Sequence, residues 1–145
     1  MSRRQFLMKS GLAVAGAAVV VTGCGDGDIG GSRIAGPAPS GTIALKVSTV
    51  PALATLGQLA TLPTDDRIAI KRTGTSTFVA ISTICTHEGT IVGITGNSFE
   101  CPNHGARYDN EGNVTRQPQA AGSASKLPRY SATYNSTTDI LTIVT

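Results

Sequence analysis

The chain has 145 residues, of which 40% are hydrophobic and 14% charged, which fits one small globular domain with an N-terminal extension. Lys and Arg number 12 against 9 Asp and Glu, but Arg3, Arg4 and Lys9 lie in the first ten residues, and without them the balance is 9 against 9. The basic excess therefore belongs to the N-terminus, and no nucleic-acid partner is expected.

Residues 1–24 have the pattern of an export signal. Ser2 to Lys9 reads SRRQFLMK, which resembles the twin-arginine motif, and an uncharged stretch of small and apolar residues follows from Gly11 to Gly23. This stretch is shorter than the ~20 residues that a membrane-spanning helix needs. We therefore expect a twin-arginine signal peptide and a location on the periplasmic or extracytoplasmic side of the membrane.

Cys24 ends the sequence Val-Thr-Gly-Cys, which resembles a bacterial lipobox. The resemblance implies lipidation of Cys24 and anchoring of the mature chain at a membrane surface. The alternatives are cleavage at a nearby small-residue site, or an uncleaved leader that serves as a marginal anchor. Residues 25–41 are rich in Gly and Pro, with little apolar periodicity, and are expected to form a flexible tether.

From Thr42 onward the sequence predicts an all-β antiparallel domain that extends to Thr145. Apolar residues alternate near Ile43, and turn-like residues separate pairs of short β segments. The region from Pro51 to Leu62 fits either one short helix or a strand and a loop. The expected strands are the segment around 43–47, 68–70 with 78–81, 90–92 with 98–100, 107–109, 129–135 and 140–144.

Two short segments carry the chemistry, and each directly follows a predicted hairpin. The first arm is Cys85-Thr86-His87 and the second is Cys101-Pro102-Asn103-His104. Together they hold both histidines and two of the three cysteines of the chain. Thiolate and imidazole groups gathered in this way predict a single metal centre.

The pattern C-x-H followed by C-x-x-H resembles the Rieske iron-sulfur family. The resemblance implies a small antiparallel β-sandwich with a three-stranded cluster-binding subdomain, in which two hairpin loops hold one 2Fe-2S cluster. Cys85 and Cys101 would bind the inner iron, and His87 and His104 the outer iron. Imidazole in place of thiolate removes negative charge, which implies a potential in the range of roughly −150 to +300 mV and a function in one-electron transfer.

A structural zinc site is the competing interpretation, because two Cys and two His also form a tetrahedral centre. The spacing argues against zinc, since zinc modules often pair C-x-x-C with H-x-x-x-H. Here each arm mixes ligand types and is followed by a glycine, Gly89 or Gly105, as in the Rieske pattern.

Residues around the arms depart from the quinol-oxidising Rieske pattern. Thr90 and Asn103 stand where those members have two cysteines that form a disulfide, and Ala106 stands where they have a serine that donates to a bridging sulfide. Tyr108 matches the family's tyrosine, and is expected to donate to cluster sulfur or to serve only as a buried strand aromatic. The charge of Glu88 is expected to favour the oxidised cluster.

The resemblance implies an electron-transfer subunit of a respiratory oxidoreductase, with a cytochrome, a quinol-oxidising subunit or a molybdenum subunit as redox partner. The alternative is a free-standing exported electron carrier or cluster-binding lipoprotein. No histidine or cysteine is left to form a separate catalytic site, so any turnover is expected to belong to a partner.

Overall fold

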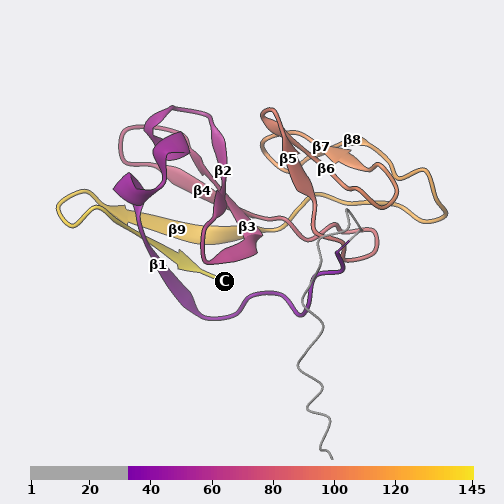
Figure 1. The fold of residues 1–145 in the computed structure, drawn as a ribbon, viewed down its shortest axis with the longest axis horizontal. Coiled ribbons are helices and arrows are strands. Elements are labelled where there is room, and N and C mark those ends of the chain that lie inside the picture. Colours follow the sequence, from indigo (N-terminus) through magenta and orange to yellow (C-terminus); the bar gives the residue numbers. More distant parts are fainter. Residues whose placement is uncertain (1–32) are drawn as a thin grey trace, which may run out of the picture.

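The computed structural model describes residues 33–145, which form two antiparallel sheets (Figure 1). The larger sheet has six strands in the order β1-β10-β9-β4-β3-β2, and the smaller has four in the order β5-β6-β7-β8. Every strand pair is antiparallel, which confirms the all-β prediction. The strands are β1 Thr42–Lys46, β2 Leu59–Leu62, β3 Asp65–Arg72, β4 Phe78–Ser82, β5 Gly93–Thr95, β6 Ser98–Glu100, β7 Arg107–Tyr108, β8 Val114–Arg116, β9 Arg129–Asn135 and β10 Ile140–Val144, with 3-10 turns η1 Val47–Thr49 and η2 Pro51–Ala54.

The six-stranded sheet curls over one apolar core. Leu45 of β1 and Leu62 of β2 belong to the same buried cluster, although their strands form the two edges of the sheet. Ile68 and Ile70 of β3 also face this core, and Leu53 of η2 closes it. The sheet must therefore bend until its edges share one interior, which gives the base of the molecule a sandwich-like shape.

A second core joins the base to the four-stranded sheet and carries the site. Ala69 lies between Ile68 and Ile70 on β3 and points to the opposite face, because strand side chains alternate. There it packs in one cluster with Ile81, Phe99 and Tyr108, and with both arm cysteines. β3 is thus apolar on both faces, and the arms are anchored in packed hydrophobic material.

The strand boundaries differ from the sequence expectations in three places. Residues 51–62 do not form one helix along their length: a four-residue 3-10 helix at Pro51–Ala54 is followed by a loop and by β2, so the region contains elements of both alternatives. The strand expected at 90–92 begins at Gly93 instead, and Thr90 and Ile91 form only isolated bridges. The cluster-binding subdomain has four strands and not three, because Val114–Arg116 pairs with β7 as β8.

The last part of the expected tether is paired with the first arm. Ile34 forms an antiparallel bridge with Thr90, and the Ala35 amide donates to the Gly89 carbonyl at 2.7 Å. The Arg33 guanidinium contacts Asp66 of the base at 2.7 Å. Residues 33–35 therefore lie against both parts of the domain, which the Gly- and Pro-rich composition did not predict. Residues 1–32, which include the leader and Cys24, lie outside the described part.

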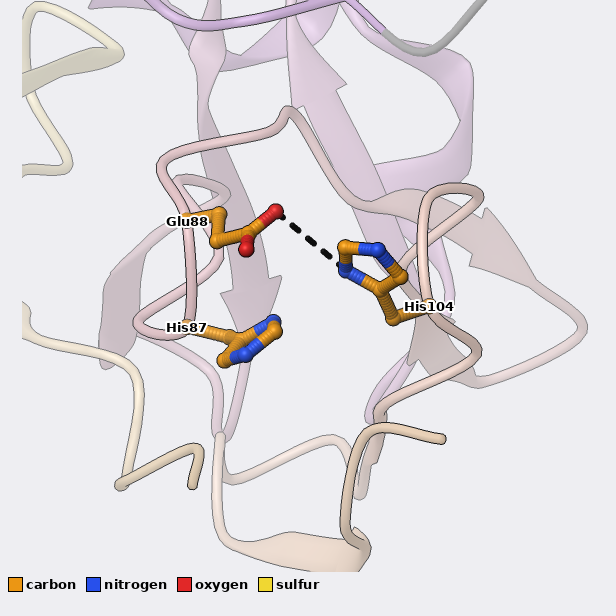
Figure 2. A group of neighbouring side chains, drawn as sticks. All are labelled: His87, Glu88 and His104. Atoms are coloured by element: carbon orange, nitrogen blue, oxygen red, sulfur yellow. Dashed lines mark ion pairs between the residues drawn. The ribbon is translucent and has the colours of Figure 1, made fainter. Parts of the chain in front are cut away.

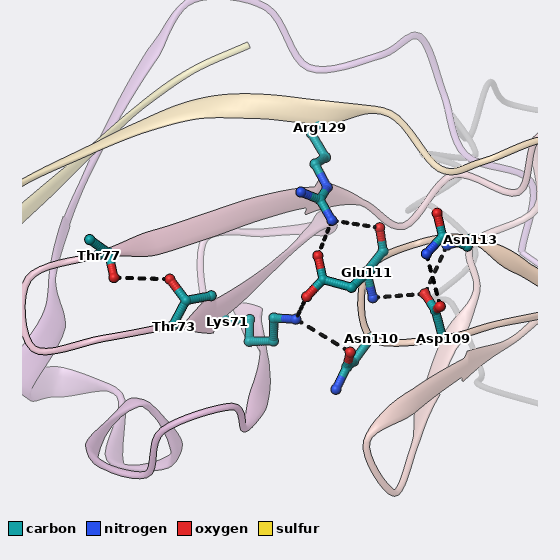
Figure 3. Close-up of polar contacts among 8 residues, drawn as sticks. All are labelled: Lys71, Thr73, Thr77, Asp109, Asn110, Glu111, Asn113 and Arg129. Carbon is teal, nitrogen blue, oxygen red and sulfur yellow. Dashed lines mark hydrogen bonds and ion pairs between the residues drawn. The ribbon is translucent and has the colours of Figure 1, made fainter.

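Lys71 forms the centre of a polar contact between the two sheets (Figure 3). Only 5% of its side chain is exposed, and its ammonium group contacts the Glu111 carboxylate and lies 3.3 Å from Asn110 Oδ1. Glu111 also accepts from Arg129 at the start of β9. Asp109 holds the turn that carries Glu111, by accepting from the Glu111 amide at 2.8 Å. The network thus ties β3 and β9 to the turn between β7 and β8.

Within residues 33–145, no helix is long and apolar enough to cross a membrane.

Candidate metal centre

The two arms share one local backbone design. The Cys85 amide donates to the Thr90 carbonyl and the Gly89 amide donates back to the Cys85 carbonyl, each at 2.8 Å. The second arm repeats this pattern, with Cys101 bonded to Ala106 and to Gly105. Gly89 and Gly105 have φ of 71° and 66°, a left-handed conformation that favours glycine. The glycine after each arm is therefore required to turn the chain back beneath its cysteine.

The two cysteines lie at the buried base of the arms. Both are 2% exposed and neither is in a disulfide. Burial raises the pKa of the Cys101 thiol, and the neighbouring Cys85 thiol raises it further, while the backbone amides of Asn103 and His104 oppose the rise by donating to the sulfur. Two facing thiols with amide donors are suited to a cation that displaces their protons and neutralises the thiolates.

The Tyr108 hydroxyl reaches this sulfur pair. Tyr108 is fully buried, and its oxygen lies 3.2 Å from Cys85 Sγ. Burial, followed by the contact with Cys85, raises the pKa of Tyr108 to about 12, so the phenol keeps its proton at neutral pH. The sequence left two roles open for Tyr108, a hydrogen-bond donor to sulfur or only a buried strand aromatic. The contact with Cys85 favours the donor role.

The Tyr108→Phe variant is expected to lower the midpoint potential of the loaded centre. A donor to sulfur stabilises the more negative, reduced state, and losing about 1 to 2 kcal/mol of that preference corresponds to a fall of roughly 40 to 90 mV. A redox titration followed by EPR measures it. The ring and its packing remain in Phe, so an unchanged potential in a folded variant would show that the hydroxyl does not act on the centre.

The two histidines lie on opposite arms and face one another (Figure 2). Their ring centroids are 5.1 Å apart. His87 Nε2 lies 2.8 Å from the Ala121 carbonyl oxygen, which can only accept, so Nε2 carries the proton and Nδ1 keeps its lone pair. His104 Nδ1 is buried and makes no hydrogen bond to any residue of the described range.

The donor set fits a centre bound by two thiolates and two imidazoles. A buried ring nitrogen without a hydrogen bond is costly unless a ligand satisfies it, and His104 Nδ1 is in that position beside His87. The full burial of the cysteines and the partial exposure of the histidines also match the division of a cluster into an inner thiolate iron and an outer imidazole iron. The structure places the two cysteines in one buried cluster and the two histidine rings next to each other, and assignment of all four as cluster ligands stays a prediction.

Glu88 links the arms beside the histidines. Its Oε2 accepts from Asn103 Nδ2 at 3.0 Å and lies 3.3 Å from His104 Nδ1, in a group of possible metal-binding side chains with His87. Asn103 is one of the two residues that replace the disulfide cysteines of quinol-oxidising members. A polar contact between the arms is thus present where those members have a covalent one.

The Glu88→Gln variant is expected to raise the midpoint potential. Its carboxylate disfavours addition of an electron nearby, and because the side chain is 51% exposed, the effect is about 1 kcal/mol, or roughly 40 mV. Gln retains an oxygen for Asn103, so the arm contact is preserved. The same redox titration at low and high salt tests the cause, because a charge effect shrinks with ionic strength. A Glu88→Gln midpoint potential equal to that of the native protein at low salt would contradict this role of the Glu88 charge.

The family resemblance implies that Pro118 begins a loop, Gln117 to Lys126, that covers the centre from a third side, but sequence reasoning did not single out the residues of this loop that contact the arms. Ala121 bonds to His87, and Ser125 exchanges two hydrogen bonds with Thr86. Neither has a motif of its own, since each acts through its backbone. Ala106 was singled out correctly as a position near the second arm: it is fully buried, and its carbonyl accepts from Cys101.

Comparisons with known proteins agree with this geometry. The family model described as "Rieske [2Fe-2S] domain" matches residues 44–133, which is more than half of the chain. The iron-sulfur subunit of the cytochrome b6-f complex of Nostoc punctiforme is 43% identical over 56 residues, or 37% of this chain and 28% of that protein. Subunit 1 of the chloroplast complex of Nicotiana tabacum is 38% identical over 53 residues, or 35% of this chain and 23% of that protein.

These matches span about a quarter of the length of the curated relatives, so they compare a segment and not the whole proteins. The family match covers both arms, their four Cys and His residues and the sheets that hold them. The chain therefore belongs to the Rieske [2Fe-2S] domain family and is an iron-sulfur electron carrier.

Proposed function

We propose that this chain is a membrane-tethered Rieske protein that serves as the iron-sulfur subunit of a respiratory oxidoreductase. The observation that carries the proposal is the pair of arms, which hold two buried cysteines and two half-exposed histidines whose rings face one another. Relatives over part of this chain are subunits of cytochrome b6-f complexes, which favours a quinol-oxidising assembly over a molybdenum enzyme. The export signal and Cys24 support attachment at the extracytoplasmic face.

The residues have separate roles in electron transfer. Cys85 and Cys101 would hold the inner iron, and His87 and His104 the outer iron, while the cluster supplies one-electron chemistry when bound. Tyr108 donates toward Cys85 sulfur and stabilises the added electron. The packed second core excludes water from the cysteine side, so an electron partner is expected to approach from the histidine side.

The second candidate is a free-standing carrier. Thr90 and Asn103 cannot form the inter-arm disulfide, and Ala106 offers no hydroxyl to a sulfide, which both differ from the quinol-oxidising pattern. Loss of a donor lowers the potential and makes oxidation of a quinol less favourable. These positions favour a carrier that exchanges electrons with soluble partners.

The assembly state in native membranes distinguishes the two candidates. Membranes are solubilised in mild detergent and separated by native electrophoresis, and the Rieske chain is located by antibody. Migration together with b-type haem supports a quinol-oxidising complex, and migration with a molybdenum cofactor supports the other kind of oxidoreductase. Migration at the size of the chain alone contradicts subunit membership and supports the free-standing carrier.

The Cys24→Ser variant is expected to lose its membrane attachment. Serine cannot carry the thioether-linked lipid of a lipobox cysteine, so the chain should move from the membrane pellet to the soluble extracytoplasmic fraction. Fractionation and the intact mass of the mature protein measure this change. A variant that stays in the pellet, with the leader still present in its mass, would instead support the uncleaved leader as the anchor.

A further inference from the structure

The loop of residues 117–126 is fastened to both cluster arms. The Gln119 amide donates to the His104 carbonyl at 2.8 Å. On the other side, Thr86 Oγ1 donates to the Ser125 carbonyl at 2.7 Å and accepts from the Ser125 amide at 2.9 Å. Gln117 closes the loop on itself, since its side chain bonds to both the amide and the carbonyl of Ala124. The loop is therefore held in place against the centre from several sides.

One peptide of this loop lies directly on the His87 ring. The Ala121 carbonyl accepts from His87 Nε2 at 2.8 Å, and Gly122 follows with φ of 99°. A Cβ atom at Gly122 would stand 3.0 Å from Nε2 and 3.2 Å from Cδ2 of His87, closer than ordinary van der Waals contact. Gly122 thus meets two requirements, a left-handed backbone and close approach to the imidazole.

The other ligand histidine has no such cover. The ring nitrogen of His104 without a hydrogen bond in the described residues is the buried Nδ1, and 29% of the His104 side chain is exposed. The two imidazoles therefore differ in their surroundings although they occupy equivalent places on the two arms.

We propose that the Ala121 carbonyl is a positioning group for His87, which fixes the ring with Nδ1 toward the iron and closes its Nε2 edge to an electron partner. Gly122 makes this possible by leaving room for the ring. The proposal rests on histidine ligation of the cluster, as the proposed function does, and is independent of the complex that the chain joins. Loss of the Rieske signal in a histidine variant tests ligation separately, so failures of the two ideas are distinguishable.

Chemical modification of the iron-loaded full-length protein tests the closed edge. Diethyl pyrocarbonate acylates accessible imidazole nitrogens, and cleavage after glutamate separates the two rings, because Glu88 and Glu100 lie between them. We expect His104 to react about tenfold faster than His87, since the Ala121 hydrogen bond must open first. Equal rates, or faster modification of His87, would overturn the proposal.

The Gly122→Ala variant tests the positioning role, with Gly57→Ala as a matched control. Gly57 has φ of 79° and open space around its Cβ position, so both variants strain the backbone but only Gly122→Ala presses on His87. In pulsed EPR of the reduced protein with ¹⁵N-labelled histidine, we expect one of the two nitrogen couplings to change in Gly122→Ala and neither in Gly57→Ala. If both nitrogen couplings are unchanged in Gly122→Ala, the proposal is contradicted. If this variant does not fold, the comparison of the modification rates of His87 and His104 in the native protein remains decisive.

Discussion

The His104→Ala variant is expected to lose the rhombic low-temperature EPR signal of a histidine-ligated cluster. Alanine removes the imidazole ring whose Nδ1 is buried without a hydrogen bond, and the remaining three ligands cannot complete the coordination of the outer iron. Because cluster binding contributes to folding, we also expect a large fall in bound iron. EPR of the reduced protein and iron analysis measure both effects.

The neighbouring Asn103→Ala variant provides the control for His104→Ala. The Asn103 side chain is exposed and bonds to Glu88, while its amide bond to the Cys101 sulfur is a backbone contact that alanine retains, so this variant should keep its signal and its iron. A His104→Ala protein with the native rhombic signal would show that the ligands are assigned wrongly. His87→Ala is expected to behave as His104→Ala does.

The Glu111→Gln variant is expected to lower the stability of the loaded protein substantially. Glu111 is the shared partner of Lys71 and Arg129, and its loss leaves a buried ammonium group without a counter-charge. Breaking a buried pair in this way costs about 3 to 5 kcal/mol, but the Glu111 side chain is 40% exposed, so we expect about 2 kcal/mol. For a domain of this size that corresponds to a fall of roughly 8 to 12 °C in the melting temperature, measured at one scan rate.

Two further variants separate the buried charge from a general charge effect. Glu100→Gln breaks the partly exposed pair with Arg107, for which a loss below about 1 kcal/mol is expected. Lys71→Met removes the buried charge itself, so it should cost less than Glu111→Gln. Equal melting temperatures for Glu111→Gln and the native protein would contradict a stabilising role of the network.

The same network predicts the direction of the pH dependence. The contact with Lys71, and then that with Arg129, lowers the pKa of Glu111 in the folded protein. A carboxyl group with a lowered folded pKa contributes stability above its unfolded pKa, and the contribution is lost as the pH falls through the folded value. The difference in stability between the native protein and Glu111→Gln should therefore narrow toward acidic pH.

Local patterns made much of the fold predictable. The strands at 129–135 and 140–144 match β9 and β10, because alternating side chains and a short turn define a hairpin without help from the rest of the chain. The two arms were identified in the same way, since the Cys and His spacing and the following glycine belong to one short segment. The structure places the two cysteines in one buried cluster and the two histidine rings 5.1 Å apart.

Contacts between distant segments could not be predicted in this way. Val114–Arg116 is a strand only because β7 offers it an edge, and Ile34 is paired only because Thr90 lies beside it. The Ala121 carbonyl acts on His87 from 34 positions away through a backbone atom that every residue carries. No residue type in the sequence marks such an interaction.

Low-temperature EPR during a reductive titration of the mature full-length protein tests the central claim most directly. A rhombic signal with an average g value below that of an all-cysteine cluster, two irons per chain and a midpoint in the range of roughly −150 to +300 mV are predicted. A protein that contains zinc in place of iron and shows no such signal would contradict the electron-transfer function and leave a structural metal domain.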